Sequence, residues 1–254
     1  MKSMKNIAIL ILMIYITSCS KSEDFEQSFG TKLVSIEYEA NNDSWTENYS
    51  YLSNGELNMI EDFRSLGRRY EIDHQSSILN EYTTYRIDDE KLIFRDSILY
   101  NSNGTIQAIH NFSINLGEDL PLSWIYEYEY DNENKVFKKS TYFVRTQKYT
   151  SIEKYYWGED NIKRVEYYNG DEELYYEYFY EYDDKVNYKN DFPTSISDPI
   201  NWSENNVTKM NWNDYYGYLD IICRPCETEY KYNLDDYPVE IEYSWGGILK
   251  LKYE

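Results

Sequence analysis

The chain has 254 residues, with 25 basic and 46 acidic side chains, and its formal net charge at pH 7 is −21. This charge argues against nucleic-acid binding, because neutralising phosphates requires basic patches, and against docking on anionic lipid by charge alone. Tyrosine occurs 31 times, against 10 glycines and 5 prolines. Because tyrosine favours pleated, half-buried surfaces, this composition predicts β-sheets rather than a thick aliphatic core.

The N-terminus has the layout of a secretory signal. Lys2 and Lys5 precede an apolar run over residues 7–16, and small residues then lead to Cys19. A positive start, an apolar run and a small-residue cleavage site are typical of a signal peptide. The run is about half as long as the roughly twenty residues that a membrane-spanning helix needs. We therefore predict a cleaved signal over residues 1–18 and no permanent transmembrane span.

The cysteine makes this signal more specific. Ile16-Thr17-Ser18-Cys19 resembles the lipobox of bacterial lipoproteins, in which the cysteine is acylated and becomes the first residue of the mature chain. The resemblance implies fatty acyl chains, such as palmitate, on Cys19, and two or more such chains anchor a protein stably to a membrane. The alternative is an ordinary signal peptide in which the cysteine stands by chance.

Residues 19–30 read as an acidic tether. Ser20 follows the cysteine, so nothing resembles the inner-membrane retention signal of enteric bacteria, and Lys21-Ser22-Glu23-Asp24 resembles the export tag of Bacteroidetes surface lipoproteins. This resemblance implies an outer-membrane lipoprotein displayed on the cell surface. The periplasmic face of the outer membrane is the alternative location.

From residue 31 to residue 254, one pattern returns seven times. An alternation of apolar or aromatic residues leads into a cluster of Asn, Asp or Gly, and a second alternation follows. Because Asn, Asp and Gly close tight turns between alternating strands, each copy predicts a β-hairpin. The copies lie at residues 49–57, 98–106, 128–136, 155–162, 180–186, 202–207 and 230–239.

The repeats define the expected fold class, which is all-β. The short connections between copies exclude parallel pairing and predict an antiparallel meander of about fourteen strands. So many strands exceed what an open twisted sheet usually carries, and we expect a large curled sheet or an incomplete barrel. Residues 187–200, punctuated by Pro193 and Pro199, form the longest predicted irregular loop.

These motifs resemble two known groups of proteins. The Tyr-x-Tyr-Asp units are similar to the tyrosine–aspartate repeats of large bacterial repeat shells. Residues 205–210 and 229–238 resemble the C-terminal part of a Bacteroidetes lipoprotein family of unknown function, described as having a porin-like, curled antiparallel sheet. The resemblance covers most of residues 30–254. It implies the fold, and it transfers no activity and no functional residue.

Cys223-Arg224-Pro225-Cys226 resembles the redox motif of thioredoxin-like proteins, in which a helix follows the cysteines. Here residues 227–232 alternate like a strand instead. In an oxidising compartment two nearby cysteines usually pair, so we predict a structural disulfide between Cys223 and Cys226. A zinc site would need two further ligands, and neither His74 nor His110 has ligand-like spacing.

No nucleophile motif, zinc-protease motif or phosphate-binding glycine loop occurs. The acidic clusters lie mostly at predicted hairpin tips, where Asp serves the turn, and none follows the pattern of a dedicated calcium loop. We therefore predict a protein that is not an enzyme and that needs no cofactor or metal. The enzymatic alternative is a glycoside hydrolase that uses a pair of carboxylates.

Aromatic rings in rows on a sheet can also stack against sugar rings. Trp157, Trp202, Trp212 and Trp245 are the candidate stacking residues, and the competing interpretation is that they belong to the core. The resulting hypothesis is a lipid-anchored, non-enzymatic binding module whose partner is a glycan or another envelope protein. A spacer lipoprotein without a ligand is the structural alternative.

Overall fold

The computed structural model describes residues 32–40, 43–64, 67–75, 78–113, 121–189, 198–216 and 225–254. The predicted signal peptide, the lipidation site Cys19, the tether and Pro193 lie outside these ranges. Among the described residues, no helix is long and apolar enough to cross a membrane.

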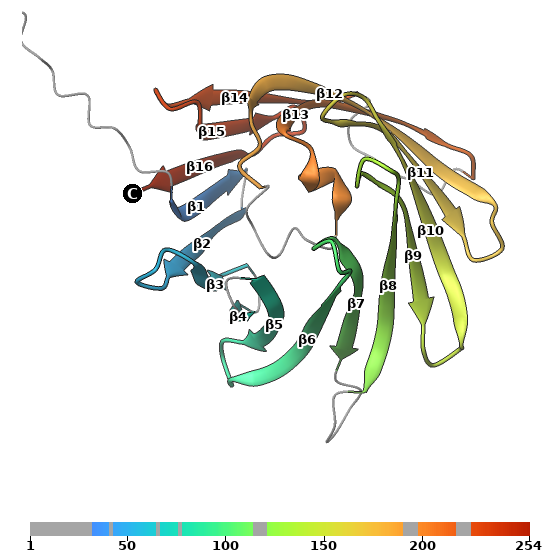
Figure 1. Ribbon diagram of the computed structural model, residues 1–254. Helices are drawn as coiled ribbons and strands as arrows, with labels where there is room; N and C mark the ends of the chain where they lie inside the picture. The colour runs from blue at the N-terminus through green and yellow to red at the C-terminus, as the bar shows by residue number, and fades with distance from the viewer. Residues whose placement is uncertain are drawn as a thin grey trace, which may run out of the picture.

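The molecule is a closed antiparallel barrel of sixteen strands (Figure 1). Each strand pairs with its neighbours in the sequence, and β1 pairs with β16. The predicted all-β antiparallel meander is confirmed, and its sheet closes completely. The strands are β1 (Leu33–Ala40), β2 (Asp43–Tyr51), β3 (Leu57–Asp62), β4 (Arg68–Gln75), β5 (Ile78–Arg86), β6 (Lys91–Tyr100), β7 (Ile106–Ser113), β8 (Leu122–Tyr130), β9 (Val136–Phe143), β10 (Lys148–Trp157), β11 (Ile162–Asn169), β12 (Leu174–Val186), β13 (Asn205–Asp214), β14 (Cys226–Tyr232), β15 (Pro238–Tyr243) and β16 (Ile248–Tyr253).

Five of the seven predicted turn clusters connect consecutive strands, and two do not. Asp183 and Asp184 lie inside β12, so the predicted hairpin at residues 180–186 is wrong. The reason is that Asp183 stabilises a bulge, where the register with β13 shifts, and its carboxylate accepts hydrogen bonds from the backbone amide of Asn206 and the hydroxyl of Tyr232. The cluster at residues 202–207 is likewise no turn, because it runs directly into β13.

The core lies inside the barrel and consists of two clusters. The first cluster is formed by β1, β2, β3, β4, β15 and β16, and the second by β6, β7, β8, β9, β10 and β11. Ile241 in the first cluster and Ile109 and Ile162 in the second are completely buried. Tyrosine rings surround both clusters, which agrees with the composition: large rings fill a wide barrel that aliphatic side chains would leave open.

A row of hydrogen bonds explains the aromatic residue at the end of many strands. The hydroxyl of Tyr51, at the end of β2, donates to the carbonyl of Leu33, at the start of β1, over 2.8 Å. Because these partly buried hydroxyls need acceptors, each bond holds one strand to the start of the strand before it. The same pattern joins Tyr100 to Leu79 (2.6 Å), Tyr182 to Ile162 (2.5 Å), Tyr230 to Val207 (2.9 Å), Tyr253 to Pro238 (2.9 Å) and, through its indole, Trp157 to Val136 (2.6 Å).

The connection between β12 and β13 enters the barrel. Its described parts, residues 187–189 and 198–204, are called the lumen segment here, and they include the short 3-10 helix η2 (Pro199–Trp202), which lies inside the ring of strands (Figure 1). Tyr188 packs against the first core cluster, whereas Ile200 and Trp202 pack against the second. The lumen segment therefore joins the two clusters.

Asn187 holds the two ends of the lumen segment together. Its side-chain amide is buried and donates to the carbonyls of Asn201 (3.1 Å) and Ser203 (3.0 Å). We predict that Asn187→Asp lowers the free energy of unfolding by about 1–3 kcal/mol, because a carboxylate oxygen would face two carbonyl oxygens without a donor. Denaturant titration measures this change.

The matched control is Asn54→Asp. Asn54 lies in the exposed β2–β3 turn, where its side-chain oxygen accepts from the Glu56 amide over 3.1 Å, and a carboxylate accepts the same bond. This variant should change stability by less than about 0.5 kcal/mol. Equal stability of the Asn187 and Asn54 variants would contradict the assigned role of Asn187.

Candidate functional site

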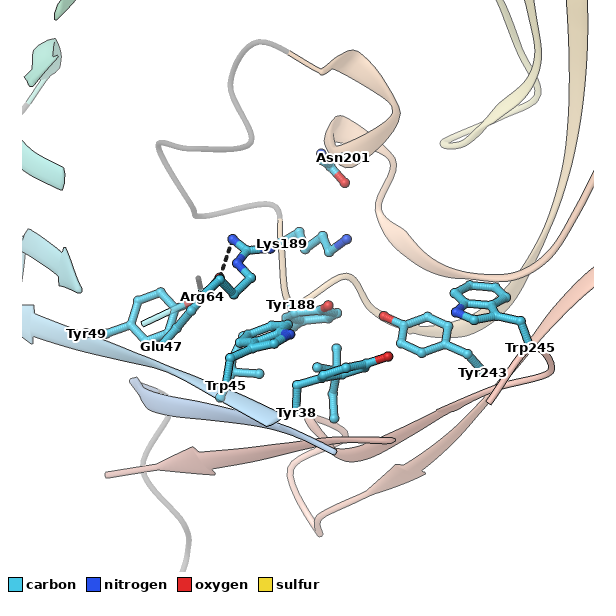
Figure 2. A pocket seen from close by; sticks show the side chains of 12 residues that line it. Tyr38, Trp45, Glu47, Tyr49, Arg64, Tyr188, Lys189, Asn201, Tyr243 and Trp245 are labelled. Atoms are coloured by element: carbon cyan, nitrogen blue, oxygen red, sulfur yellow. Dashed lines mark hydrogen bonds and ion pairs between the residues drawn. The ribbon is translucent and has the colours of Figure 1, made fainter. Parts of the chain in front are cut away.

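A cavity of about 350 Å³ lies inside the barrel, next to β1, β2 and the β15–β16 turn (Figure 2). We call it the aromatic cavity. It is built from the inward faces of β1, β2 and β16, from the β15–β16 turn and from the lumen segment. Six aromatic side chains line it, namely Tyr38, Trp45, Tyr49, Tyr188, Tyr243 and Trp245.

Two stacked aromatic pairs form parts of the wall, one from β1 and β2 and the other from the end of β15 and the β15–β16 turn. Tyr38 and Trp45 are paired residues on β1 and β2, and their ring centroids lie 5.1 Å apart at an interplanar angle of 18°. Tyr243 and Trp245 lie 4.4 Å apart at 21°. Trp245 remains 41% exposed, so part of this pair is accessible to a ligand.

The β15–β16 turn has to come close to Tyr38, and a glycine makes this approach possible. Gly247 has a backbone φ of +113°, and a Cβ atom placed there would lie 2.6 Å from the Tyr38 hydroxyl oxygen. Only glycine accepts both this conformation and this contact. The turn sequence therefore sets the distance between the two aromatic pairs.

A charged cluster stands beside Trp45. The Arg64 guanidinium lies 4.7 Å from the centre of the Trp45 ring, 2.9 Å from a Glu47 carboxylate oxygen and 2.7 Å from an Asp62 carboxylate oxygen. Burial raises the pKa of Glu47 above its usual 4.5, and the hydrogen bond from Tyr49 and the charge of Arg64 oppose this rise. The cluster thus places positively and negatively charged hydrogen-bonding groups at the rim of the cavity.

The lumen segment adds two further polar groups. Lys189 and Asn201 both reach toward the cavity (Figure 2). Lys189 is exposed, and its ammonium group lies 5.7 Å from the centre of the Tyr188 ring. Apolar walls with a few well-placed polar groups are the usual composition of a small-molecule site.

The structure places the four predicted tryptophans in different environments. Trp245 lines the aromatic cavity. Trp212 is only 3% exposed, Trp157 packs against the second core cluster and donates to the Val136 carbonyl, and Trp202 packs against the same cluster and stacks on Tyr130. The four rings therefore do not form one surface.

Sequence reasoning missed Trp45. It shares the inward face of β2 with Glu47 and Tyr49, at alternating positions. Alternation identifies the face but not whether a ring lies in a core or beside a cavity. The close spacing of a tryptophan, an acid and a tyrosine on one face was the only available signal.

The predicted disulfide falls partly outside the described residues. Cys226 is buried at 4% exposure and is disulfide-bonded, whereas Cys223 lies outside the described ranges. The pairing of these two residues therefore stays a prediction. Across the described ranges, no group of three or more His, Cys, Asp or Glu side chains is placed to hold a metal ion.

The fold defines a structural class, the closed antiparallel barrel of sixteen strands, and solved structures with a similar fold are known. The chain is similar to the crystal structure of a porin-like protein from Bacteroides uniformis, with a TM-score of 0.56 and 10% identity, over 89% of this chain and 98% of that one. A porin-like protein from Bacteroides vulgatus gives a TM-score of 0.56 and 11% identity, over 88% and 98%. At these identities the likeness concerns the fold alone.

No protein-family model matches the sequence, and a search of curated proteins finds no match either. The predicted antiparallel architecture is therefore supported by structure rather than by sequence. Membership of the lipoprotein family that the motifs resemble stays a prediction.

The raised pKa of Glu47 gives a testable pH dependence. We predict that the Glu47 carboxyl titrates above 4.5, and that Arg64→Gln raises this pKa further, because the variant removes the positive charge that lowers it. Since the folded state holds the proton more tightly, the stabilising contribution of the protonated group is present at low pH and is lost as the pH rises through the raised pKa.

Carboxyl ¹³C NMR against pH measures this titration. Lys252→Gln is the control, since Lys252 pairs with Glu37 on the outer wall and lies outside the cavity, so the Glu47 midpoint should not move. A Glu47 midpoint at or below 4.5 would contradict the buried environment described above.

Proposed function

We propose that this chain is a lipid-anchored, non-enzymatic envelope protein that binds a glycan in the aromatic cavity. The observation that carries the proposal is the pair of stacked aromatic walls, Tyr38–Trp45 and Tyr243–Trp245, which line one cavity with a rim of charged and amide groups. The envelope location is supported by the lipobox-like sequence at Cys19 and by the similarity of the fold to porin-like proteins of Bacteroides.

The chemistry of a sugar fits this cavity. A pyranose ring has an apolar face of C–H groups and an edge of hydroxyls. The C–H face can lie on an aromatic ring such as Trp245, while the hydroxyls can bond with Glu47, Lys189 and Asn201. Rigid stacked rings lose little conformational entropy when a ligand binds, which favours affinity.

The outer wall of the barrel supports anchoring by lipid rather than by the strands. Ion pairs cross neighbouring strands around the ring: Lys250 lies 2.9 Å from Glu39, Lys138 lies 2.7 Å from Glu129, and Lys209 lies 3.1 Å from Glu181. Membrane-spanning barrels instead carry an outward apolar band, where charged side chains are costly. We therefore propose that the barrel stands in water and that acyl chains on Cys19 hold it at the membrane.

Substitution of the exposed tryptophan tests glycan binding. A glycan array probed with the chain purified in detergent identifies binding saccharides, and calorimetry then measures their affinity. We predict that Trp245→Ala weakens this affinity about tenfold or more, because the open stacking face is lost. Trp245 is exposed, so its removal should leave the barrel folded.

Tyr149→Ala is the matched control. Tyr149 is 46% exposed on β10 and lies outside the aromatic cavity, so the variant should bind like the parent chain. Unchanged affinity in the Trp245 variant, or a blank array, would contradict the proposed glycan site.

The lipid anchor is tested separately. In cells fed with labelled palmitate, the parent chain should become labelled and partition into the detergent phase. Cys19→Ala should lose both properties, because the acylated thiol is absent. Mass spectrometry that finds the parent mature chain unacylated would refute this part of the proposal.

A further inference from the structure

A second cavity, of about 370 Å³, lies in the same half of the barrel. We call it the distal cavity. Four tyrosines contribute to its wall, and these are Tyr51, Tyr188, Tyr237 and Tyr253. Tyr237 and Tyr253 have ring centroids 5.6 Å apart, and the Lys32 ammonium lies 5.5 Å from the centre of the Tyr51 ring. The distal cavity thus repeats the composition of the aromatic cavity, with rings beside a cation.

The two cavities follow one another along the same strands. On β1, Leu33 lines the distal cavity and Tyr38 lines the aromatic cavity. On β2, Tyr51 lines the distal cavity and Trp45 lines the aromatic cavity. Because Tyr38 pairs with Trp45, the two cavities follow in the same order along both strands. With a rise of about 3.3 Å per residue, the five steps from residue 33 to residue 38 span roughly 17 Å.

Tyr188 stands between the cavities and lines both of them. Figure 2 shows its ring between Trp45 and Tyr243, and its hydroxyl bonds with that of Tyr243. Its backbone amide donates to the side chain of Asn206 over 3.4 Å, and the neighbouring Asn187 is tied to Ser203. The shared wall is therefore a tyrosine whose backbone is held by the buried side-chain amides of Asn187 and of Asn206 on β13.

Resting on the proposed glycan function, we propose that the two cavities are successive subsites for one linear oligosaccharide. The ligand lies along the inward face of β1 and β2, with Tyr188 as the aromatic platform between the subsites. A single sugar needs only one stacked wall, whereas rings placed over roughly 17 Å along one pair of strands match a chain of sugars. The lumen segment then has two roles: it joins the core clusters and, through Tyr188, it contributes the aromatic platform shared by the two subsites.

The test is the dependence of affinity on chain length. The probes are linear malto-, cello-, xylo- and mannooligosaccharides of two to eight units, titrated by calorimetry into the full chain purified in detergent. For the series that binds best, the affinity should rise about tenfold or more from the disaccharide to the hexasaccharide. The Trp245→Ala variant should weaken binding at every length.

Tyr237→Ala separates the two subsites. The β14–β15 turn around Tyr237 is closed by backbone hydrogen bonds with Asn233 that alanine retains, so the barrel should fold. The ratio of hexasaccharide to disaccharide affinity should fall toward one in this variant, whereas Tyr237→Phe, which keeps the ring, should restore most of the ratio. Tyr149→Ala, on the outer wall, serves as the unaffected control.

The outcomes distinguish this inference from the function on which it rests. Affinity that does not change with chain length, or a length dependence that survives in Tyr237→Ala, overturns the two-subsite inference and leaves glycan binding standing. Binding of no saccharide at all overturns both.

Discussion

Pairing of the first strand with the last is the constraint on which this structure depends. Ile36 on β1 lies opposite Leu251 on β16, and Tyr38 lies opposite Leu249. This pairing removes both sheet edges and gives every strand two neighbours. It also turns one face of the sheet into the wall of a closed interior. Without it, β1 and β16 would be free edges and the aromatic cavity, which both strands line, would have no continuous wall.

A closed interior of this width has to be filled, and the chain fills it with tyrosine and with its own longest connection. The rings occupy much volume, and their hydroxyls bond to carbonyls at strand starts, as Tyr182 does with Ile162. The lumen segment packs Tyr188 on one core cluster and Trp202 on the other. Among the described residues, two cavities remain along β1, β2 and β16. The proposed binding function uses the space that this packing leaves.

Much of the fold could be predicted from sequence because turn chemistry and period-two alternation are local. Closure could not, since it depends on register accumulated over all strands. Asp183 shows a second limit: an aspartate that accepts nearby amide bonds serves a bulge as well as a turn. The candidate site was harder to predict from the sequence than the fold. Trp212 and Trp245 are both tryptophans next to polar residues in the sequence, yet one is buried and the other lines a cavity, a difference set by strands distant in sequence.

Hydrogen exchange of the purified chain tests closure most directly, because amide protection reports whether a strand is paired on both sides. If β1 and β16 are paired as described, their amides should be protected as strongly as those of β8 and β9, which have two neighbours in any arrangement of the sheet. If β1 and β16 exchange rapidly while β8 and β9 stay protected, the sheet is open. The enclosed lumen, and with it the site proposed here, would then be contradicted.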